Sequence, residues 1–116
     1  MLILQNYIHF YLKVKKMDKI EFQFDPKKHA SNLKKHRLDF SDAMEVLDAR
    51  YRLDIPVQRN GELRTQSFAY VMGVLRVLTV VHTKRDNAVR IISYRPASEK
   101  ESEFYYEWLA NPTHRT

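Results

Sequence analysis

Arginines recur through the part of the sequence where strands are expected: Arg64, Arg76, Arg90 and Arg95. A two-residue turn at positions 72 and 73 would place Arg64 opposite Val81, and a turn centred on positions 85 and 86 would place Arg90 opposite the same valine. The same registers place Arg76 and Arg95 opposite each other on the other face of the sheet. Like charges on neighbouring strands repel, so such pairs are favoured where an anion such as phosphate binds. The structural alternative is that each arginine pairs with a carboxylate, such as Glu62 or Glu101.

Histidine is the side chain that titrates nearest neutral pH, so it is the first candidate for proton transfer. His82 falls near the end of an apolar strand, and His36 falls at the end of a basic helix. A helix C-terminus also stabilises a positive charge, so His36 is either a catalytic or a structural residue. His29 and His114 are expected at the surface.

Some aromatic and basic residues of the chain are of the types that bind nucleic acid. Tyr105 and Tyr106 could donate a hydrogen bond or stack on a base. Lys28 and Lys35, with their neighbours at positions 27 and 34, give the first helix a basic face that could follow a phosphate backbone. A solvated charged surface is the alternative interpretation.

Several chemistries are disfavoured by what the sequence lacks. There are no cysteines, so disulfides and thiolate sites are excluded, and a reducing cytoplasm is the expected location. The histidines do not show the H-x-x-x-H or H-E-x-x-H spacing of a metal site. With two glycines in the chain and no G-x-S-x-G or phosphate-binding loop, acyl transfer and nucleotide chemistry are not expected. We therefore expect neither a metal nor another cofactor.

The elements that must position these residues begin with a strand and two helices. Residues 19–24 alternate apolar and polar, which predicts a half-buried strand. Asp25-Pro26 then supplies a capping carboxylate and a first-turn proline for a helix that ends near His36. The next helix has an apolar stripe formed by Phe40, Ala43, Met44 and Leu47.

A run of strands and a last helix follow. Residues 51–57 form an expected edge strand, because Pro56 cannot donate to a ladder, and Asn60-Gly61 predicts a hairpin. Further strands are expected at 64–71, 74–83 and 88–95, with residues 77–81 central because they are mostly apolar. Residues 98–101 form a capping box for a helix that ends at Asn111-Pro112. The apolar stripe of this helix consists of Phe104, Tyr105, Trp108 and Leu109. The predicted class is α+β, with an antiparallel β-meander sheet, two N-terminal helices and one C-terminal helix.

The bulk composition fits one folded domain with an anionic partner. The chain has 116 residues, 44% hydrophobic and 29% charged, and a net charge of +6. That charge favours nucleic acid, an anionic membrane surface or an acidic protein. Residues 1–16 are apolar with a basic end, but the order is wrong for a signal peptide and the run is too short to span a bilayer. We therefore interpret residues 1–16 as an extension, either upstream of the true start or a real extra element, and residues 17–116 as the domain.

Two sequence blocks resemble the BrnT family of bacterial type II toxins. The first, F-D-x-x-K-x-x-x-N-x-x-K-H, contains Phe24, Asp25, Lys28, Asn32, Lys35 and His36. The second, R-I-I-S-x-R-x-A-x-x-x-E, contains Arg90, Ile91, Ile92, Ser93, Arg95, Ala97 and Glu101. The resemblance covers about residues 17–108. Arg37 stands where the family usually carries glycine, and this puts the usual left-handed helix exit in doubt, because a side chain resists that conformation.

The resemblance implies a RelE-like ribonuclease that cleaves RNA and inhibits translation. Such cleavage without a metal needs a base, an acid and cations for the charge that builds on phosphorus. Arg64, Arg90 and Arg95 would supply the cations, and His82 or His36 the proton transfer. RNA would be bound by Lys28, Lys35, Arg76, Tyr105 and Tyr106. The capping-box role is favoured over catalysis for Glu101.

The resemblance also implies a BrnA-like antitoxin with a ribbon-helix-helix DNA-binding part, so that operator DNA is bound only through the complex and no membrane is involved. Two alternatives remain open. One is a catalytically inactive antitoxin-docking module that acts as a co-repressor. The other is a nucleic-acid-binding domain without a toxin role.

Overall fold

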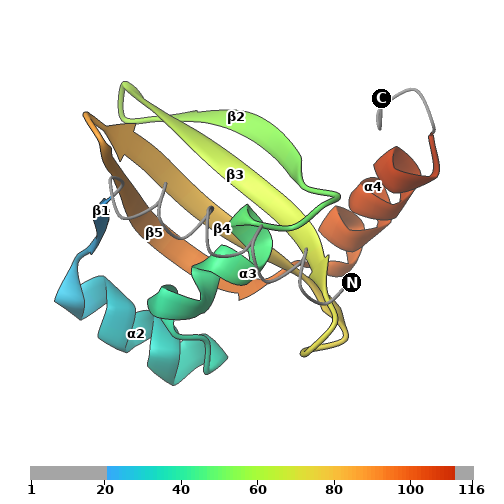
Figure 1. Cartoon of the computed structure of the whole chain (residues 1–116), viewed down its shortest axis with the longest axis horizontal. Helices are drawn as coiled ribbons and strands as arrows, with labels where there is room; N and C mark the ends of the chain where they lie inside the picture. Colours follow the sequence, from blue (N-terminus) through green and yellow to red (C-terminus); the bar gives the residue numbers. More distant parts are fainter. Residues whose placement is uncertain (1–20, 112–116) are drawn as a thin grey trace, which may run out of the picture.

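The computed structural model describes residues 21–111, so the segment at 1–16 lies outside the described residues. The elements follow the expected order (Figure 1). They are β1 (Glu21–Phe24), α2 (Pro26–His36), the 3-10 helix η1 (Phe40–Ala43), α3 (Met44–Leu47), β2 (Leu53–Arg59), β3 (Glu62–Val71), β4 (Arg76–Arg85), β5 (Ala88–Pro96) and α4 (Glu99–Ala110). The second expected helix is thus one 3-10 turn followed by one short α-helix.

The sheet confirms the α+β class and corrects one part of the expected topology. Its five strands lie in the order β1-β5-β4-β3-β2, and β2 to β5 form the expected antiparallel meander. β1, however, pairs with β5 in parallel, from Glu21 opposite Ala88 to Phe24 opposite Ile91. The sheet is therefore mixed, because this one pair of strands is parallel and the others are antiparallel. The two parallel strands are far apart in the sequence, with two helical segments and three strands between them. β4 is central and β2 is an edge strand, as the apolar run and Pro56 predicted.

The turns set the register of the meander. Asn60 and Gly61 have φ of 53° and 76°, so the predicted hairpin is confirmed. The next turn contains Met72 to Leu75 rather than two residues, because Val71 pairs with Arg76. Positive φ at Leu75, 58°, lets the chain close this longer turn.

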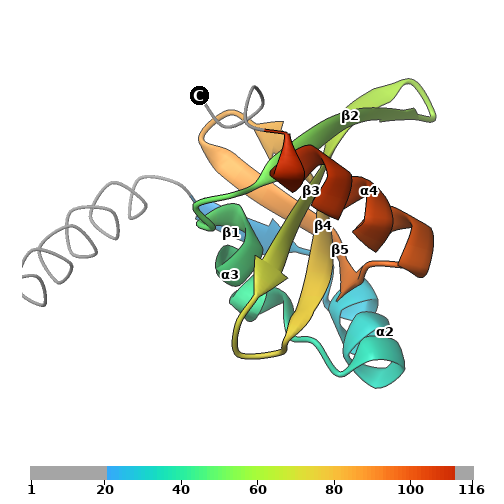
Figure 2. The ribbon, with the colours of Figure 1, turned by 90° about the vertical axis from the view of Figure 1, so that its right-hand side faces the viewer.

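Helices cover the two faces of the sheet unequally (Figures 1 and 2). α2, η1 and α3 pack on one face, where the core includes Phe40, Val46, Leu78, Ile91 and Tyr94. α4 crosses the other face and buries Tyr105 against a smaller cluster from the strands. Of its predicted stripe, Tyr105 is buried but Phe104 is 54% exposed, so that part of the stripe was wrong.

Local signals explain α2 and its attachment to the sheet. Asp25 caps the helix by accepting from the Lys27 amide, and Pro26 is its first residue. Arg37 ends it in the left-handed conformation, φ 56°, so the exit that we doubted is present despite the missing glycine. Asn32 is buried, and its amide exchanges hydrogen bonds with the backbone of Tyr94, at 2.6 Å to the carbonyl oxygen and 3.2 Å from the N–H. The side chain thereby continues the β5 ladder where β1 has ended.

His29 is not a simple surface residue. Its Nε2 lies 2.9 Å from Asp39 Oδ1, and its ring contacts Phe24 and Phe40 with centroid separations of 4.8 and 5.3 Å. The imidazole therefore joins α2 to the start of η1. The surface assignment was wrong because the pattern around His29 does not reveal that the chain returns past it ten residues later.

Candidate functional site

Three of the predicted arginines lie on the same face of the sheet. Arg95 is opposite Thr79 and Arg90 is opposite Thr83, and these two threonines are four residues apart on β4. Residues an even number apart on a strand share a face, and residues directly opposite each other on neighbouring strands share one as well. Arg90 and Arg95 therefore share the face that carries α4.

Arg64 lies on this face too. Phe68, which is part of the cluster under α4, is opposite Thr79, and Arg64 precedes Phe68 by four residues on β3. We call Arg64, Arg90 and Arg95 the arginine face. Arg64 and Arg90 were expected to share a face, and this is confirmed.

The registers behind that expectation were wrong. Val81 is opposite Gln66 and Ser93, not opposite Arg64 and Arg90. Each turn shifts the register by two residues, and an irregularity in β5 adds one more before Ser93. Arg76 pairs with Val71 and does not face Arg95.

A β-bulge brings Arg95 to the side of Arg90. The two residues are five positions apart, so a regular strand would place them on opposite faces. His82 pairs with Ile91 but its neighbour Val81 pairs with Ser93, so Ile92 is an extra residue in β5. Such a residue reverses the alternation beyond it, and bulges are frequent next to active sites.

Arg95 is held by Glu101. Its two terminal nitrogens donate to the two carboxylate oxygens at 2.8 and 3.0 Å, and Gln66 donates to the same carboxylate at 3.1 Å. Glu101 also accepts from the Ser98 N–H at 2.8 Å, so the predicted capping box is confirmed. The hydrogen bonds from Arg95 lower the pKa of Glu101 to about 2. The same pairing raises the pKa of Arg95. Glu101 is therefore ionised and a weak base at neutral pH.

The other two arginines are held less tightly. Arg64 Nε lies 3.4 Å from Glu62 Oε1, a long contact, and the Arg64 side chain is 18% exposed. Arg90 is half-buried, and among the side chains that the structure describes, which exclude those at positions 21 and 85, it has neither an ion pair nor a hydrogen-bond partner. Arg90 is thus the cation on this face with the most capacity to bind an added anion.

His82 lies on the opposite face of the sheet. Its Nε2 is 2.9 Å from Ser67 Oγ, and Ser67 Oγ donates to Asp54 Oδ1 at 2.6 Å. Burial and the nearby Arg52 lower the pKa of His82, so the imidazole is neutral at neutral pH. Since Ser67 gives its proton to Asp54, it accepts from His82. The structure therefore places His82 in a polar chain across β2, β3 and β4 and does not bring it to the arginine face.

The predicted residues of α2 also lie away from the arginine face. His36 is the last residue of α2 and is half-exposed, while Lys28 and Lys35 are exposed. Because α2 packs on the face opposite α4, these cations form a separate basic surface. His36 lies in the last turn of α2, which is the position on which its structural interpretation rests.

The two tyrosines have different environments. Tyr105 is 2% exposed, and its hydroxyl donates to the Tyr51 carbonyl at 2.6 Å, so its ring has no open face for a base. Burial also raises the pKa of Tyr105. Tyr106 is exposed but lines an apolar groove rather than the arginine face. The stacking role proposed for Tyr105 was wrong, because the sequence pattern did not show which side of α4 faces the sheet.

Sequence reasoning missed two further residues that bear on the site. Arg59 is directly opposite Glu62 near the end of the β2–β3 hairpin, so it adds a cation close to the arginine face. The signal that could have found Arg59 is the two-residue Asn60-Gly61 turn, because it places Arg59 opposite Glu62. Glu62 itself is 38% exposed, so it can reach a bound molecule as well as pair with an arginine.

The part of the chain that the structure describes has neither a metal site nor a membrane-spanning helix. Among residues 21–111, histidine and acidic side chains do not gather into a group that could hold a metal ion. No helix in this range is long and apolar enough to cross a bilayer.

Comparison with known proteins identifies the class. Residues 24–101 match the family of BrnT ribonuclease toxins of type II toxin–antitoxin systems. The match spans both resembling blocks and the whole sheet except three residues of β1, and the chain belongs to this family. Comparison with curated proteins gives no match. A type II toxin works with a protein antitoxin, so this chain has a protein partner.

Proposed function

We propose that this chain is a RelE-like endoribonuclease toxin that cleaves RNA without a metal ion and binds the scissile phosphate on the arginine face. Family membership supports the ribonuclease activity. The observation that carries the location is the β-bulge at Ile92, which brings Arg95 to the face that already carries Arg64 and Arg90. A cluster of three cations on one face of a sheet suits a bound polyanion.

The arginines have distinct roles in this proposal. Arg90, which has no polar partner among the side chains that the structure describes, makes the principal contact with the phosphate. Arg64 can exchange its long contact with Glu62 for a phosphate oxygen. Arg95, oriented by Glu101, adds positive potential from a fixed place. A guanidinium suits these roles because its planar fork matches phosphate oxygens and stabilises the charge that builds in the transition state.

Proton transfer needs a base on the same side of the sheet as the phosphate. Glu62 is the better placed carboxylate, because it is more exposed than Glu101 and lies two residues from Arg64 on the same strand. It would take the proton of the 2′-OH as that oxygen attacks phosphorus. The bond from phosphorus to the 5′-oxygen breaks in the same step, and this oxygen takes a proton from water as it leaves. His82 and His36 are the competing candidates from the sequence, and their variants separate the two cases. With Glu62 as the base, His82→Ala and His36→Ala keep the cleavage rate. If one of the histidines is catalytic, replacing it removes one limb of the pH–rate profile.

The protein partner in this proposal is a BrnA-like antitoxin. It carries a ribbon-helix-helix DNA-binding part, neutralises the toxin and lets the complex repress its own operon. RNA is the substrate of the free toxin, and operator DNA is bound only through the antitoxin.

The arginine face is tested by shortening its side chains one at a time. Arg64→Ala, Arg90→Ala and Arg95→Ala are each expected to slow RNA cleavage at least about tenfold, or roughly 1.4 kcal/mol of transition-state stabilisation. Lys84→Ala is the matched control, because Lys84 is an exposed cation on β4 whose position in the strand places it on the other face. Circular dichroism and melting curves report the folded fraction of each variant. If all three arginine variants cleave at the parental rate per folded molecule, the site is elsewhere.

One observation favours a second candidate function. Arg95 is fully engaged with Glu101, and Arg64 contacts Glu62, so two of the three cations already have carboxylate partners. A catalytically inactive protein that only docks to the antitoxin would show this pairing. Expression of the chain without its antitoxin distinguishes the two functions, since only an active ribonuclease arrests growth.

A further inference from the structure

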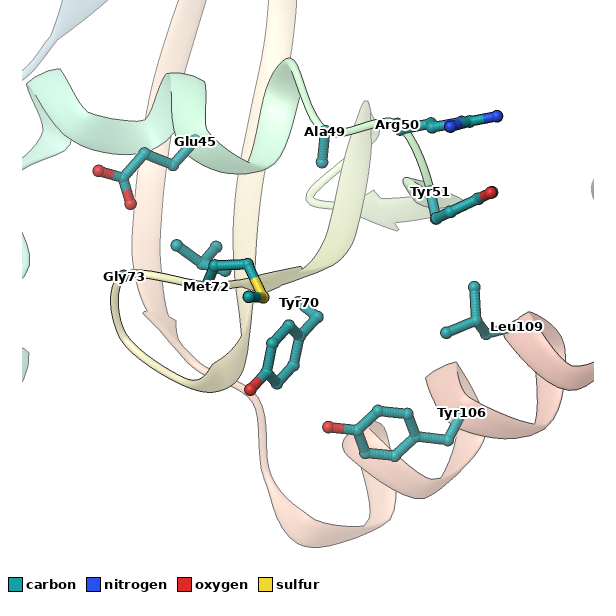
Figure 3. Close-up of a pocket in the computed structure, with 10 residues that line it drawn as sticks. Glu45, Ala49, Arg50, Tyr51, Tyr70, Met72, Gly73, Tyr106 and Leu109 are labelled. Carbon is teal, nitrogen blue, oxygen red and sulfur yellow. The ribbon is translucent and has the colours of Figure 1, made fainter.

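An apolar groove opens between the end of α3, the β3–β4 turn and α4 (Figure 3). It has a volume of about 770 Å³ and is lined mainly by Ala49, Tyr51, Tyr70, Met72, Tyr106 and Leu109. Figure 3 shows Tyr106 and Leu109 reaching into it from α4, opposite the segment that carries Ala49 and Tyr51. None of the lining residues belongs to the arginine face.

The β3–β4 turn beside this groove carries apolar side chains that are exposed to solvent. Met72 is 75% exposed, and Val74 and Leu75 of the same turn are exposed as well. Leu75 also adopts a positive φ, which a residue with a side chain resists. Exposed apolar side chains beside an apolar groove are typical of a surface that another molecule covers.

Charges of opposite sign stand at the two ends of the groove. Glu45 on α3 lies beside Met72 and Gly73 at one end, and Arg50 lies beside Tyr51 at the other, as Figure 3 shows. Both side chains are exposed. The guanidinium of Arg50 is 5.3 Å from the Tyr51 ring centroid, which fixes the position of this cation. A bound segment therefore meets a negative charge at one end and a positive charge at the other.

The edges of the sheet are poor places for a partner strand. β2 carries Pro56, which has no N–H to donate. At the other edge the described part of β1 has four residues, and beyond Phe24 the Asn32 amide already bonds the backbone of β5. Of the two common ways to bind a protein segment, addition of a strand is disfavoured here and a helix in a groove is favoured.

We propose that this groove binds an amphipathic helix of the antitoxin, with apolar side chains against Met72 and Tyr106, a basic residue beside Glu45 and an acidic residue beside Arg50. The inference rests on the proposed function, because the antitoxin is the partner that it assigns. The groove is apart from the arginine face, so this contact anchors the antitoxin, and another part of the antitoxin must cover the arginines.

The test measures the affinity of full-length variants for the antitoxin encoded beside this chain's gene, by calorimetry. Met72→Lys is expected to raise Kd at least about tenfold, as for a buried apolar anchor. Leu63→Lys is the matched control, since Leu63 is 67% exposed on β3, the strand that leads to Met72, but lies outside the groove. If Met72→Lys and Leu63→Lys bind the antitoxin equally well, the groove is not the docking site.

The charge pair tests the orientation of the helix. Glu45→Lys and Arg50→Glu are each expected to weaken binding about fivefold at low salt, and less at high salt. Reversing the facing charge on the antitoxin should restore the affinity of the matching variant only. If neither single variant changes Kd, or if both charge reversals rescue both variants, the orientation proposed here is wrong.

Other occupants of the groove would be recognised in the same samples. If the isolated protein self-associates and Met72→Lys abolishes the association without changing antitoxin affinity, a second copy occupies the groove. If Met72→Lys lowers the melting temperature of the isolated chain by several degrees, a segment of this chain covers it. Either result overturns the proposal. RNA cleavage by the free variants is measured in parallel, so an inactive parent protein refutes the ribonuclease mechanism and leaves the docking result intact.

Discussion

Replacement of Glu101 by glutamine removes a charge at the junction of β5 and α4. The glutamine side chain keeps the shape of the original and can still accept from the Ser98 N–H, so the capping box survives. The ionic part of the contact with Arg95, now 2.8 and 3.0 Å, is lost. Gln66 loses its charged acceptor in the same step. The variant therefore isolates the electrostatic contribution of one carboxylate.

The size of that contribution follows from the pKa of Glu101. A fall from the ordinary value of 4.5 to about 2 corresponds to roughly 3 kcal/mol if it is counted in full. The Glu101 side chain is 26% exposed and that of Arg95 33% exposed, so solvent screens the pair. We therefore expect Glu101→Gln to lower the free energy of unfolding by about 1–2 kcal/mol at pH 7.

The stabilisation by Glu101 should depend on pH. Because the pKa is lower in the folded protein, the stabilisation is complete above about pH 4.5 and is lost as the pH falls toward 2. Denaturant unfolding between pH 7 and pH 2 should show the parent and Glu101→Gln curves converging at the acid end. Glu103→Gln, an exposed position on the same helix, is the control and should follow the parent. Curves that stay equally separated at every pH would refute the electrostatic account.

Two further predictions concern α2. Arg37→Gly should raise the free energy of unfolding by about 0.5–1 kcal/mol, because glycine adopts the φ of 56° without strain, and Arg37→Ala should not; a fall in the urea midpoint for the glycine variant would contradict this. Asn32→Ala should cost about 2–4 kcal/mol, since it leaves the buried N–H and C=O of Tyr94 without partners. Asn32→Asp should cost at least as much at neutral pH, because its carboxylate cannot donate and would be buried beside the carbonyl oxygens of Leu38 and Tyr94. Equal urea midpoints for parent and Asn32→Ala would show that water replaces the amide.

Much of the fold was predictable because its signals are local. Asp25-Pro26 begins α2, Asn60-Gly61 closes a hairpin, and Ser98 with Glu101 caps α4, in each case through bonds within a few residues. The edge position of β2 and the central position of β4 also followed from Pro56 and an apolar run. The sequence also predicted correctly that Arg64 and Arg90 share one face of the sheet.

The tertiary structure alone decided which residues meet. The bulge at Ile92 lies where the outer partner of β5 changes from β1, which ends opposite Ile91, to the Asn32 amide, which bonds Tyr94. Neither partner is near β5 in the sequence, so the alternation of β5 by itself gave no sign that Arg95 would join Arg90. His82 lies on the other face from the arginines. Its neighbour Thr83 is opposite Arg90, and adjacent residues on a strand point to opposite faces of the sheet. The sequence determined the elements and their order, whereas long-range pairing determined the face on which each side chain lies.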